Sequence, residues 1–186
     1  MTFLDIRKML PATLLFALAM ACSTLLLARE CEITLSNHHI DYGPQQHPSG
    51  AVTALATYRL DRREIRLNAS CWDDSAIALS LRGPLHASRM KFSDQGQVNV
   101  RMSQAQLDGR PVALARLNDL GATGAGLESL ATAPGDVIVP VEGGLAARGK
   151  TLVLSLEIIP ELPLSDMRSR DAKVHEGQLR IDASAT

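Results

Sequence analysis

Two of the three cysteines fall where a disulfide is expected. Cys31 opens the run 31–35 and Cys71 closes the run 65–71, and in both runs apolar and polar residues alternate. Each sulfur shares its phase with the apolar residues of its own run, so both point toward a core. The N-terminus indicates export to a compartment that oxidises thiols. The pattern predicts a Cys31–Cys71 disulfide, and the alternative is a pair of free buried thiols.

Three of the five histidines, His38, His39 and His47, lie close together in the sequence. Histidine is a common metal ligand, so these three residues are the candidates for a metal site. Adjacent residues on a strand point to opposite faces, so His38 and His39 cannot both turn toward one ion. We interpret all three as exposed side chains. The sequence therefore predicts no metal ion and no cofactor.

Other chemistry-bearing residues give no catalytic pattern. Asp73 and Asp74 form a carboxylate pair, but they follow Trp72 in an expected turn. The glycine-rich stretch 121–126 lacks the spacing and the flanking strand and helix of a phosphate-binding loop. Neither G-x-S-x-G nor H-E-x-x-H occurs. We expect a protein that is not an enzyme.

Composition limits the partners. The chain has 186 residues, 19 Lys and Arg against 20 Asp and Glu, and a formal net charge of −1. This balance leaves no basic stripe for a phosphate backbone, and 3% aromatic residues offer few platforms for stacked bases. No nucleic-acid partner is expected. A hydrophobic content of 46% is enough for one domain with its own core.

The N-terminus has the pattern of a secretory signal peptide. Arg7 and Lys8 precede an apolar run over 9–28 that contains two small-residue cleavage candidates, after Ala21 and after Ala28. A retained membrane anchor is the alternative, because the run is nearly long enough to span a bilayer. A lipoprotein signal fits Cys22 poorly. We expect a signal peptide over 1–28 and one domain over 29–186.

From residue 31 onward the apolar pattern has a period of two, which is typical of half-buried strands. The phase slips at Ala105, which predicts a bulge, and Asp108-Gly109 predicts a tight hairpin. Pro140 places its strand at a sheet edge. Strands or extended segments are expected over 31–35, 52–60, 62–71, 77–82, 98–107, 137–141, 152–158 and 179–183.

Three segments between these strands are expected to be irregular. Residues 72–75 predict a turn, 117–133 a long loop, and 164–173 a polar turn-like segment. No helical period competes in the exported part of the chain. Roughly seven to nine short strands separated by Gly, Pro and Asp turns predict an all-β fold, a β-sandwich.

The order of several motifs resembles the subunits of chaperone–usher fimbriae, in particular minor fimbrial proteins. The opening Cys31-Glu32-Ile33-Thr34-Leu35 is followed by Asp41-Tyr42-Gly43, and the second cysteine ends the run 65–71. The likeness covers nearly all of 29–186. Further matching segments are Leu107-Asp108-Gly109-Arg110-Pro111-Val112, Ala133-Pro134-Gly135-Asp136, Gly149-Lys150-Thr151-Leu152-Val153-Leu154 leading to Ile159-Pro160, and Glu176-Gly177-Gln178-Leu179-Arg180-Ile181.

This resemblance implies an incomplete immunoglobulin-like β-sandwich that is completed by a donor strand. In the family, a periplasmic chaperone fills the vacant groove first. The N-terminal extension of the next subunit then replaces it at the outer-membrane usher. By analogy, the groove and the chaperone contacts involve Ile33 and Leu35 on the first strand and Leu179 and Ile181 on the last. The implied location is the cell surface, reached through the periplasm, with other fimbrial subunits and a host or surface receptor as partners.

Two features depart from the family pattern. Polymerising subunits carry a donor strand before the first cysteine, whereas cleavage after Ala21 or Ala28 leaves only 22–30 or 29–30, which would suit a tip or terminal subunit. The end of the chain, 183–186, also lacks the aromatic residue that many pilins carry there. Two alternatives stay open: a self-sufficient periplasmic or secreted β-sandwich that binds a sugar or small ligand, and a secreted hydrolase.

Overall fold

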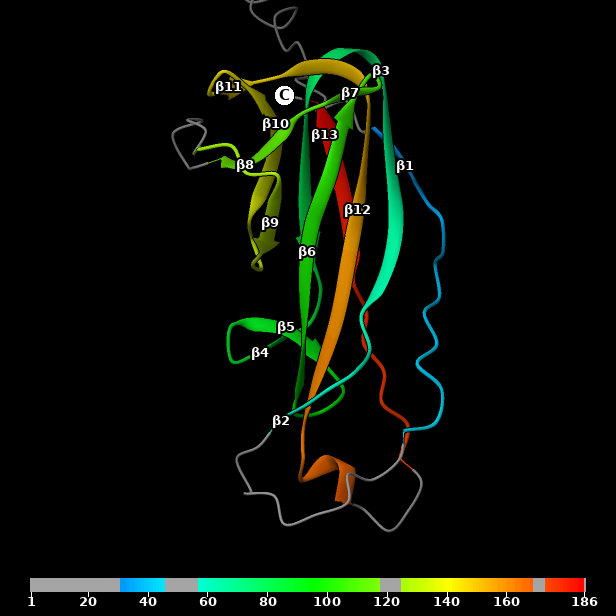
Figure 1. The fold of residues 1–186 in the computed structure, drawn as a ribbon. Coiled ribbons are helices and arrows are strands. Elements are labelled where there is room, and N and C mark those ends of the chain that lie inside the picture. The colour runs from blue at the N-terminus through cyan, green and yellow to red at the C-terminus, as the bar shows by residue number, and fades with distance from the viewer. Residues whose placement is uncertain (1–30, 46–56, 118–124, 169–172, 186) are drawn as a thin grey trace, which may run out of the picture.

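The structure of the protein is a computed structural model that describes residues 31–45, 57–117, 125–168 and 173–185 (Figure 1). The expected signal peptide, His47 and most of the expected segment 52–60 lie outside these ranges. Within them the chain is almost entirely β-structure, which confirms the all-β prediction. No helix of the described part is long and apolar enough to cross a membrane.

Thirteen strands and one 3-10 helix form within the described residues, more than the sequence predicts, because several are hairpin arms of only two residues. In chain order they are β1 (Glu32–Leu35), β2 (Thr57–Arg59), β3 (Arg63–Arg82), β4 (Leu85–His86), β5 (Arg89–Phe92), β6 (Gly96–Leu107), β7 (Arg110–Pro111), β8 (Ala113–Leu117), β9 (Ser129–Thr132), β10 (Val137–Glu142), β11 (Leu145–Ala146), β12 (Arg148–Pro163), η3 (Asp166–Arg168) and β13 (Arg180–Ala185).

The long strand β3 joins two parts of an antiparallel sheet. Its first part, residues 63–70, pairs with β1 and β12, and its last part, residues 77–82, pairs with β10 and β13. Figure 1 shows β3 curving over the top of the molecule between these two parts. Leu67 from the first part and Leu79 from the last are both fully buried in one core cluster. The two parts therefore pack as a sandwich around a shared core.

The alternating pattern of the sequence corresponds to the buried face of each long strand. On β12, Leu152, Leu154 and Leu156 are almost completely buried, while Val153 and Glu157 are half-buried on the opposite face. Leucine, isoleucine and valine make up most of the interior, as expected for a chain with few aromatic residues. Each fully buried side chain of this size contributes about 1.5–3 kcal/mol to folding.

Two local predictions are confirmed. The pairing of β6 with β12 shifts register between Val153 and Ser155, and the opposing Gln104 has a positive φ of 54°, as expected for a bulge before Ala105. Asp108 and Gly109 have φ values of 50° and 79°, which is the geometry of a two-residue hairpin between β6 and β7. Residue types that tolerate a left-handed backbone thus fix this turn.

The predicted turn over 72–75 is wrong, because β3 continues through it. Ser75 pairs with Gly149, and Ala76 pairs with Arg148, so the ladder to β12 persists around the bend. The Asp-rich composition that indicated a turn instead reflects exposure on the outside of this curve. Trp72, the single tryptophan of the chain, is 89% exposed there.

Two other predictions for the middle of the chain are corrected. β10 is not an edge strand, because it pairs with both β3 and β8. Pro140 is tolerated there because β3 pairs only with Val137 and Ile138, so the missing N–H removes no bond to β3. The expected loop over 117–133 contains the strand β9, which pairs with β6.

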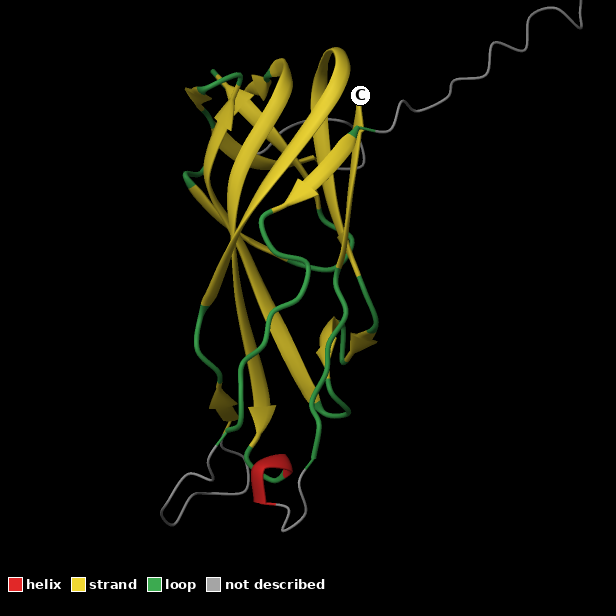
Figure 2. Cartoon of the chain, turned by 90° about the vertical axis from the view of Figure 1, so that its right-hand side faces the viewer, coloured by secondary structure: helices red, strands yellow, loops and turns green. Residues whose placement is uncertain are grey.

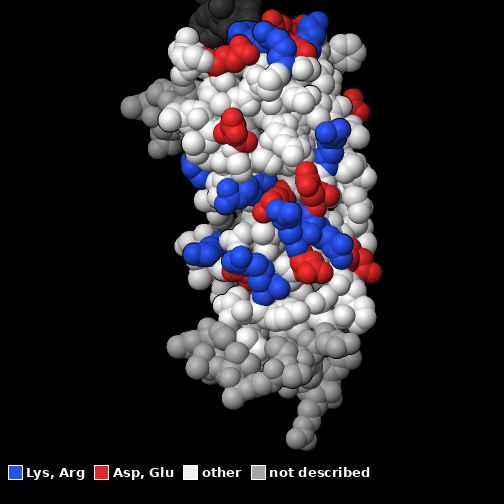
Figure 3. Space-filling model, viewed as in Figure 1, with Lys and Arg blue, Asp and Glu red and all other residues white. Residues whose placement is uncertain are grey.

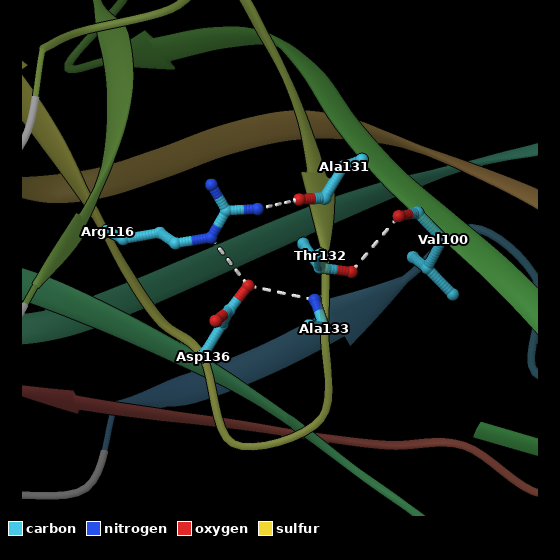
Figure 4. Close-up of polar contacts among 6 residues, drawn as sticks. All are labelled: Val100, Arg116, Ala131, Thr132, Ala133 and Asp136. Carbon is cyan, nitrogen blue, oxygen red and sulfur yellow. Dashed lines mark hydrogen bonds and ion pairs between the residues drawn. The ribbon is translucent and has the colours of Figure 1, made fainter. Parts of the chain in front are cut away.

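One polar cluster connects β8, β9 and the turn before β10 (Figure 4). The Asp136 carboxylate accepts a hydrogen bond of 2.7 Å from Arg116 Nε and one of 2.8 Å from the Ala133 amide. Arg116 also donates to the carbonyl of Ala131, and Thr132 Oγ1 donates to the carbonyl of Val100. These bonds join β9 to both of its neighbours.

Candidate functional site

A long open groove lies between the segment that follows β1 and the segment that precedes β13. Residues 35–45 form one wall and residues 173–181 form the other, and the groove has a volume of about 1070 Å³. Both segments descend on the same side of the molecule toward the end that carries η3 (Figures 1 and 2). The groove runs between two stretches of extended chain.

The floor of this groove is the core of the sandwich. Core-facing side chains of β3, β6 and β12 contribute to it, together with residues of β5 and of the region around η3. The floor residues are Leu60, Ile65, Leu81, Phe92, Val98, Val100, Leu156, Ile158, Pro160, Leu162 and Met167. Most of these side chains are less than one-tenth exposed. An occupant of the groove would therefore meet a continuous apolar surface.

Hydrogen bonding shows that β1 and β13 meet at one end only. The Cys31 amide donates a hydrogen bond of 3.2 Å to the Ala183 carbonyl. No other backbone hydrogen bond joins these two strands in the described residues. The N–H and C=O of an antiparallel strand residue point to the same side, and the side alternates. Ile33 and Leu35 on β1, and Ile181 on β13, therefore direct their backbone groups into the space between the strands.

The walls of the groove carry few backbone bonds of their own. Among the described residues, 37–45 form no backbone–backbone hydrogen bond, and 173–179 form one, from the Ser93 amide to the Glu176 carbonyl at 2.7 Å. The hydroxyl of the wall residue Tyr42 donates a hydrogen bond of 3.4 Å to the Ile158 carbonyl. Burial raises the pKa of Tyr42, and the nearby Arg63 opposes this. Side chains of the first wall bond some of its backbone groups, since Asn37 accepts from the His39 amide and Asp41 accepts from the Gly43 amide. Neither wall is paired to a neighbouring strand along its length.

The predicted disulfide is confirmed. Cys31 and Cys71 are bonded, with a Cα–Cα distance of 4.5 Å, and each is 8% exposed. The bond links the start of β1 to β3 beside the point where β1 meets β13. It therefore fixes the closed end of the groove.

The predicted groove residues are placed as follows. Leu35, Leu179 and Ile181 line the groove, whereas Ile33 packs against the core without lining it. Sequence reasoning missed Phe92 in the short strand β5, Met167 in η3, and Leu162, which lies on β12 beyond the predicted end of that strand at residue 158. The available signals were the apolar phase of Met90 and Phe92 in β5 and the continuation of the β12 phase from Ile158 to Leu162.

Other candidate residues do not form a reactive centre in the described part of the chain. His38 and His39 are exposed on the wall of the groove. Asp73 and Asp74 are exposed on the bend of β3, and Asp74 lies 4.0 Å from Arg148. No group of three His, Cys, Asp or Glu suited to a metal ion occurs among the described residues.

No protein-family model and no curated protein matches this chain. The groove, its unpaired edges and the disulfide are therefore the observations from which a function is inferred.

Proposed function

We propose that this protein is a structural subunit of a chaperone–usher surface fimbria, whose sandwich is completed by a β-strand from another protein. The observation that carries the proposal is the apolar groove between Leu35 and Ile181, which opens where the pairing of the first and last strands stops after the Cys31–Ala183 bond. Such an arrangement favours addition of a strand, in which main-chain bonds give affinity and alternate side chains fill pockets.

The shape of the groove favours a strand over a compact ligand. Its walls extend over residues 35–45 and 173–181, and an extended chain advances about 3.3 Å per residue, so an occupant would share the length of both walls. The floor residues named above are apolar, and the polar lining residues, such as His38, Asp41 and Gln178, lie mainly on the two extended walls. A strand with alternating apolar residues satisfies both the floor and the walls.

The proposal implies partners of defined chemistry. A periplasmic chaperone would supply the first strand, and another fimbrial subunit would replace it at the outer-membrane usher. The protein would then act at the cell surface as a minor or tip subunit, with a structural or adhesive role and no catalysis. The Cys31–Cys71 disulfide is compatible with passage through an oxidising compartment.

The test is strand complementation of the purified mature chain. A synthetic peptide in which apolar residues alternate with Thr or Lys should raise the unfolding temperature, measured by circular dichroism. A peptide of the same composition with its apolar residues in blocks should not. Unfolding at high temperature without help, unchanged by either peptide, would contradict the proposal and favour the self-sufficient ligand-binding module.

A pair of variants locates the binding to the groove. Leu35→Arg places a charge on the groove wall, whereas Thr34→Arg places the same charge on the exposed face of the same strand, outside the lining. We expect Leu35→Arg to abolish the effect of the peptide and Thr34→Arg to retain it. Equal loss in both variants, with folding intact, would argue against the groove as the site.

A further inference from the structure

A second pocket lies on the opposite face of the β6–β12 pair, facing away from the core. In the paired stretches 97–101 of β6 and 157–161 of β12, the even-numbered Val98, Val100 and Ile158 line the groove, and the odd-numbered residues lie on the opposite face. The outward pocket has a volume of about 480 Å³, within the range of small-ligand sites. Its lining residues are Arg59, Arg89, Asn99, Val100, Arg101, Ala131, Glu157, Ile159 and Glu161.

The two carboxylates of this pocket are already paired. Glu161 lies 2.8 Å from Arg59 Nη2 and accepts a hydrogen bond of 2.8 Å from Gln97, and Glu157 lies 3.2 Å from Arg62. Burial acts to raise the pKa of Glu161, but the hydrogen bonds from Gln97, Arg59 and Asn99 together lower it. Both carboxylates thus have a cation that offsets their charge.

Two arginines of the pocket have no carboxylate partner in the described residues. Arg101 donates a hydrogen bond of 3.3 Å to Ser129 Oγ. Glu157 on β12 is the register partner of Arg101 on β6, but Glu157 forms its ion pair with Arg62. Arg89 is exposed on β5 and has no ion pair with any described residue. The pocket therefore holds two guanidinium groups whose charge remains available to a ligand.

Figure 3 shows how these charges are distributed. From the side on which β6 lies in front, basic and acidic side chains interleave in a band across the molecule, and a mostly uncharged zone separates this band from a second charged group at the top. In this pocket the basic side chains are interrupted by Glu157 and Glu161, so it offers no continuous basic surface to a phosphate-rich polymer. The same carboxylates accept hydrogen bonds from hydroxyl groups.

We propose that this pocket binds an acidic sugar. The planar guanidinium forks of Arg89 and Arg101 suit a single carboxylate. Glu157, Glu161 and the Asn99 amide would bind hydroxyls of the ring, and the half-buried Ile159 offers an apolar surface to one ring face. The pocket uses the outward face of the sheet, so the proposal does not depend on the role of the groove.

The experiment is a titration of the full mature chain, followed by nuclear magnetic resonance shifts and isothermal calorimetry. The probes are glucuronate, galacturonate and N-acetylneuraminate, compared with glucose, galactose and sodium sulfate. We expect saturable binding of at least one acidic sugar, with the neutral sugars and sulfate at least about tenfold weaker, a difference of 1.4 kcal/mol.

Matched variants then test the residues. Arg89→Gln and Arg101→Gln should each weaken binding about tenfold or more, whereas Arg66→Gln, an exposed arginine of β3 outside the pocket, should leave it unchanged. All three residues are exposed, so circular dichroism should show unaltered folding. Absence of saturable binding, sulfate binding as tight as that of the sugars, or equal loss in Arg66→Gln would each overturn the proposal.

Discussion

The amide of Cys31 donates a hydrogen bond of 3.2 Å to the carbonyl of Ala183, and this bond marks where the first and last strands touch. Beyond it β1 and β13 separate, and the groove opens along the space between them. The disulfide holds the same end to β3. One end of the sandwich edge is therefore fixed by covalent and hydrogen bonds, while the rest borders the open groove.

Removal of the disulfide should destabilise the protein by about 4 kcal/mol, because the bond closes a loop of 40 residues in the unfolded chain. The double variant Cys31→Ser with Cys71→Ser should lower the midpoint of urea unfolding accordingly. Circular dichroism of the oxidised and substituted chains, each with a complementing peptide, measures the difference. A change below about 1 kcal/mol would mean that the loop is constrained by other contacts.

Replacement of Asp108 tests the link between the β6–β7 turn and β12. Its carboxylate accepts hydrogen bonds of 3.1 Å from the Lys150 amide and 2.9 Å from the Thr151 amide. Asp108→Ala should cost about 2 kcal/mol, from two lost bonds and a left-handed alanine. Asp108→Asn retains an acceptor and tolerates the positive φ, so its cost should be clearly smaller in the same denaturation assay.

Asp136 and Arg116 should behave as a coupled pair. Asp136→Ala removes the acceptor of both Arg116 and the Ala133 amide, and should cost about 1–3 kcal/mol. Arg116→Ala should cost less, because that arginine is half exposed. The double variant should be less destabilised than the sum of the two single variants, and strict additivity would show that the pair does not interact.

Glu161 should make the protein sensitive to acid. Its folded-state pKa lies below the ordinary value of 4.5, so its contribution to stability is present above that pH and is lost as the pH falls through the lower folded-state pKa. Glu161→Gln should flatten the decline of the unfolding free energy below about pH 4.5. The variant Glu142→Gln, at an exposed residue, controls for removal of a carboxylate. If the unfolding free energy of Glu161→Gln fell with decreasing pH as steeply as that of the unsubstituted protein, the prediction would be contradicted.

Local patterns were sufficient to predict part of this structure. The alternation over 65–71 fixes the buried face of β3, and the shared apolar phase of Cys31 and Cys71 predicts their bond. Gln104 and Asp108 lie where the apolar phase and turn chemistry indicate a bulge and a hairpin. In each case neighbouring residues contain the whole signal, because the strand period and the turn preference act over a few positions.

The remainder depends on contacts between distant parts of the chain. The floor of the groove brings Phe92, Leu162 and Met167 beside Leu35, and no local pattern encodes that convergence. The position of Pro140 inside a paired strand depends on how far β3 extends beside β10. Likewise, the bend of β3 resembles a turn in composition and continues as a strand only because Gly149 and Arg148 pair with it.

The exposure of Trp72 determines how this protein can be observed. With 89% of its surface in water, the indole of the folded chain already has the solvent environment of an unfolded one. Its intrinsic fluorescence should shift little during denaturation, so emission spectroscopy would follow unfolding poorly. The same side chain becomes a sensitive reporter of anything that covers the bend of β3, because such contact would shift its emission to the blue and shield it from iodide quenching.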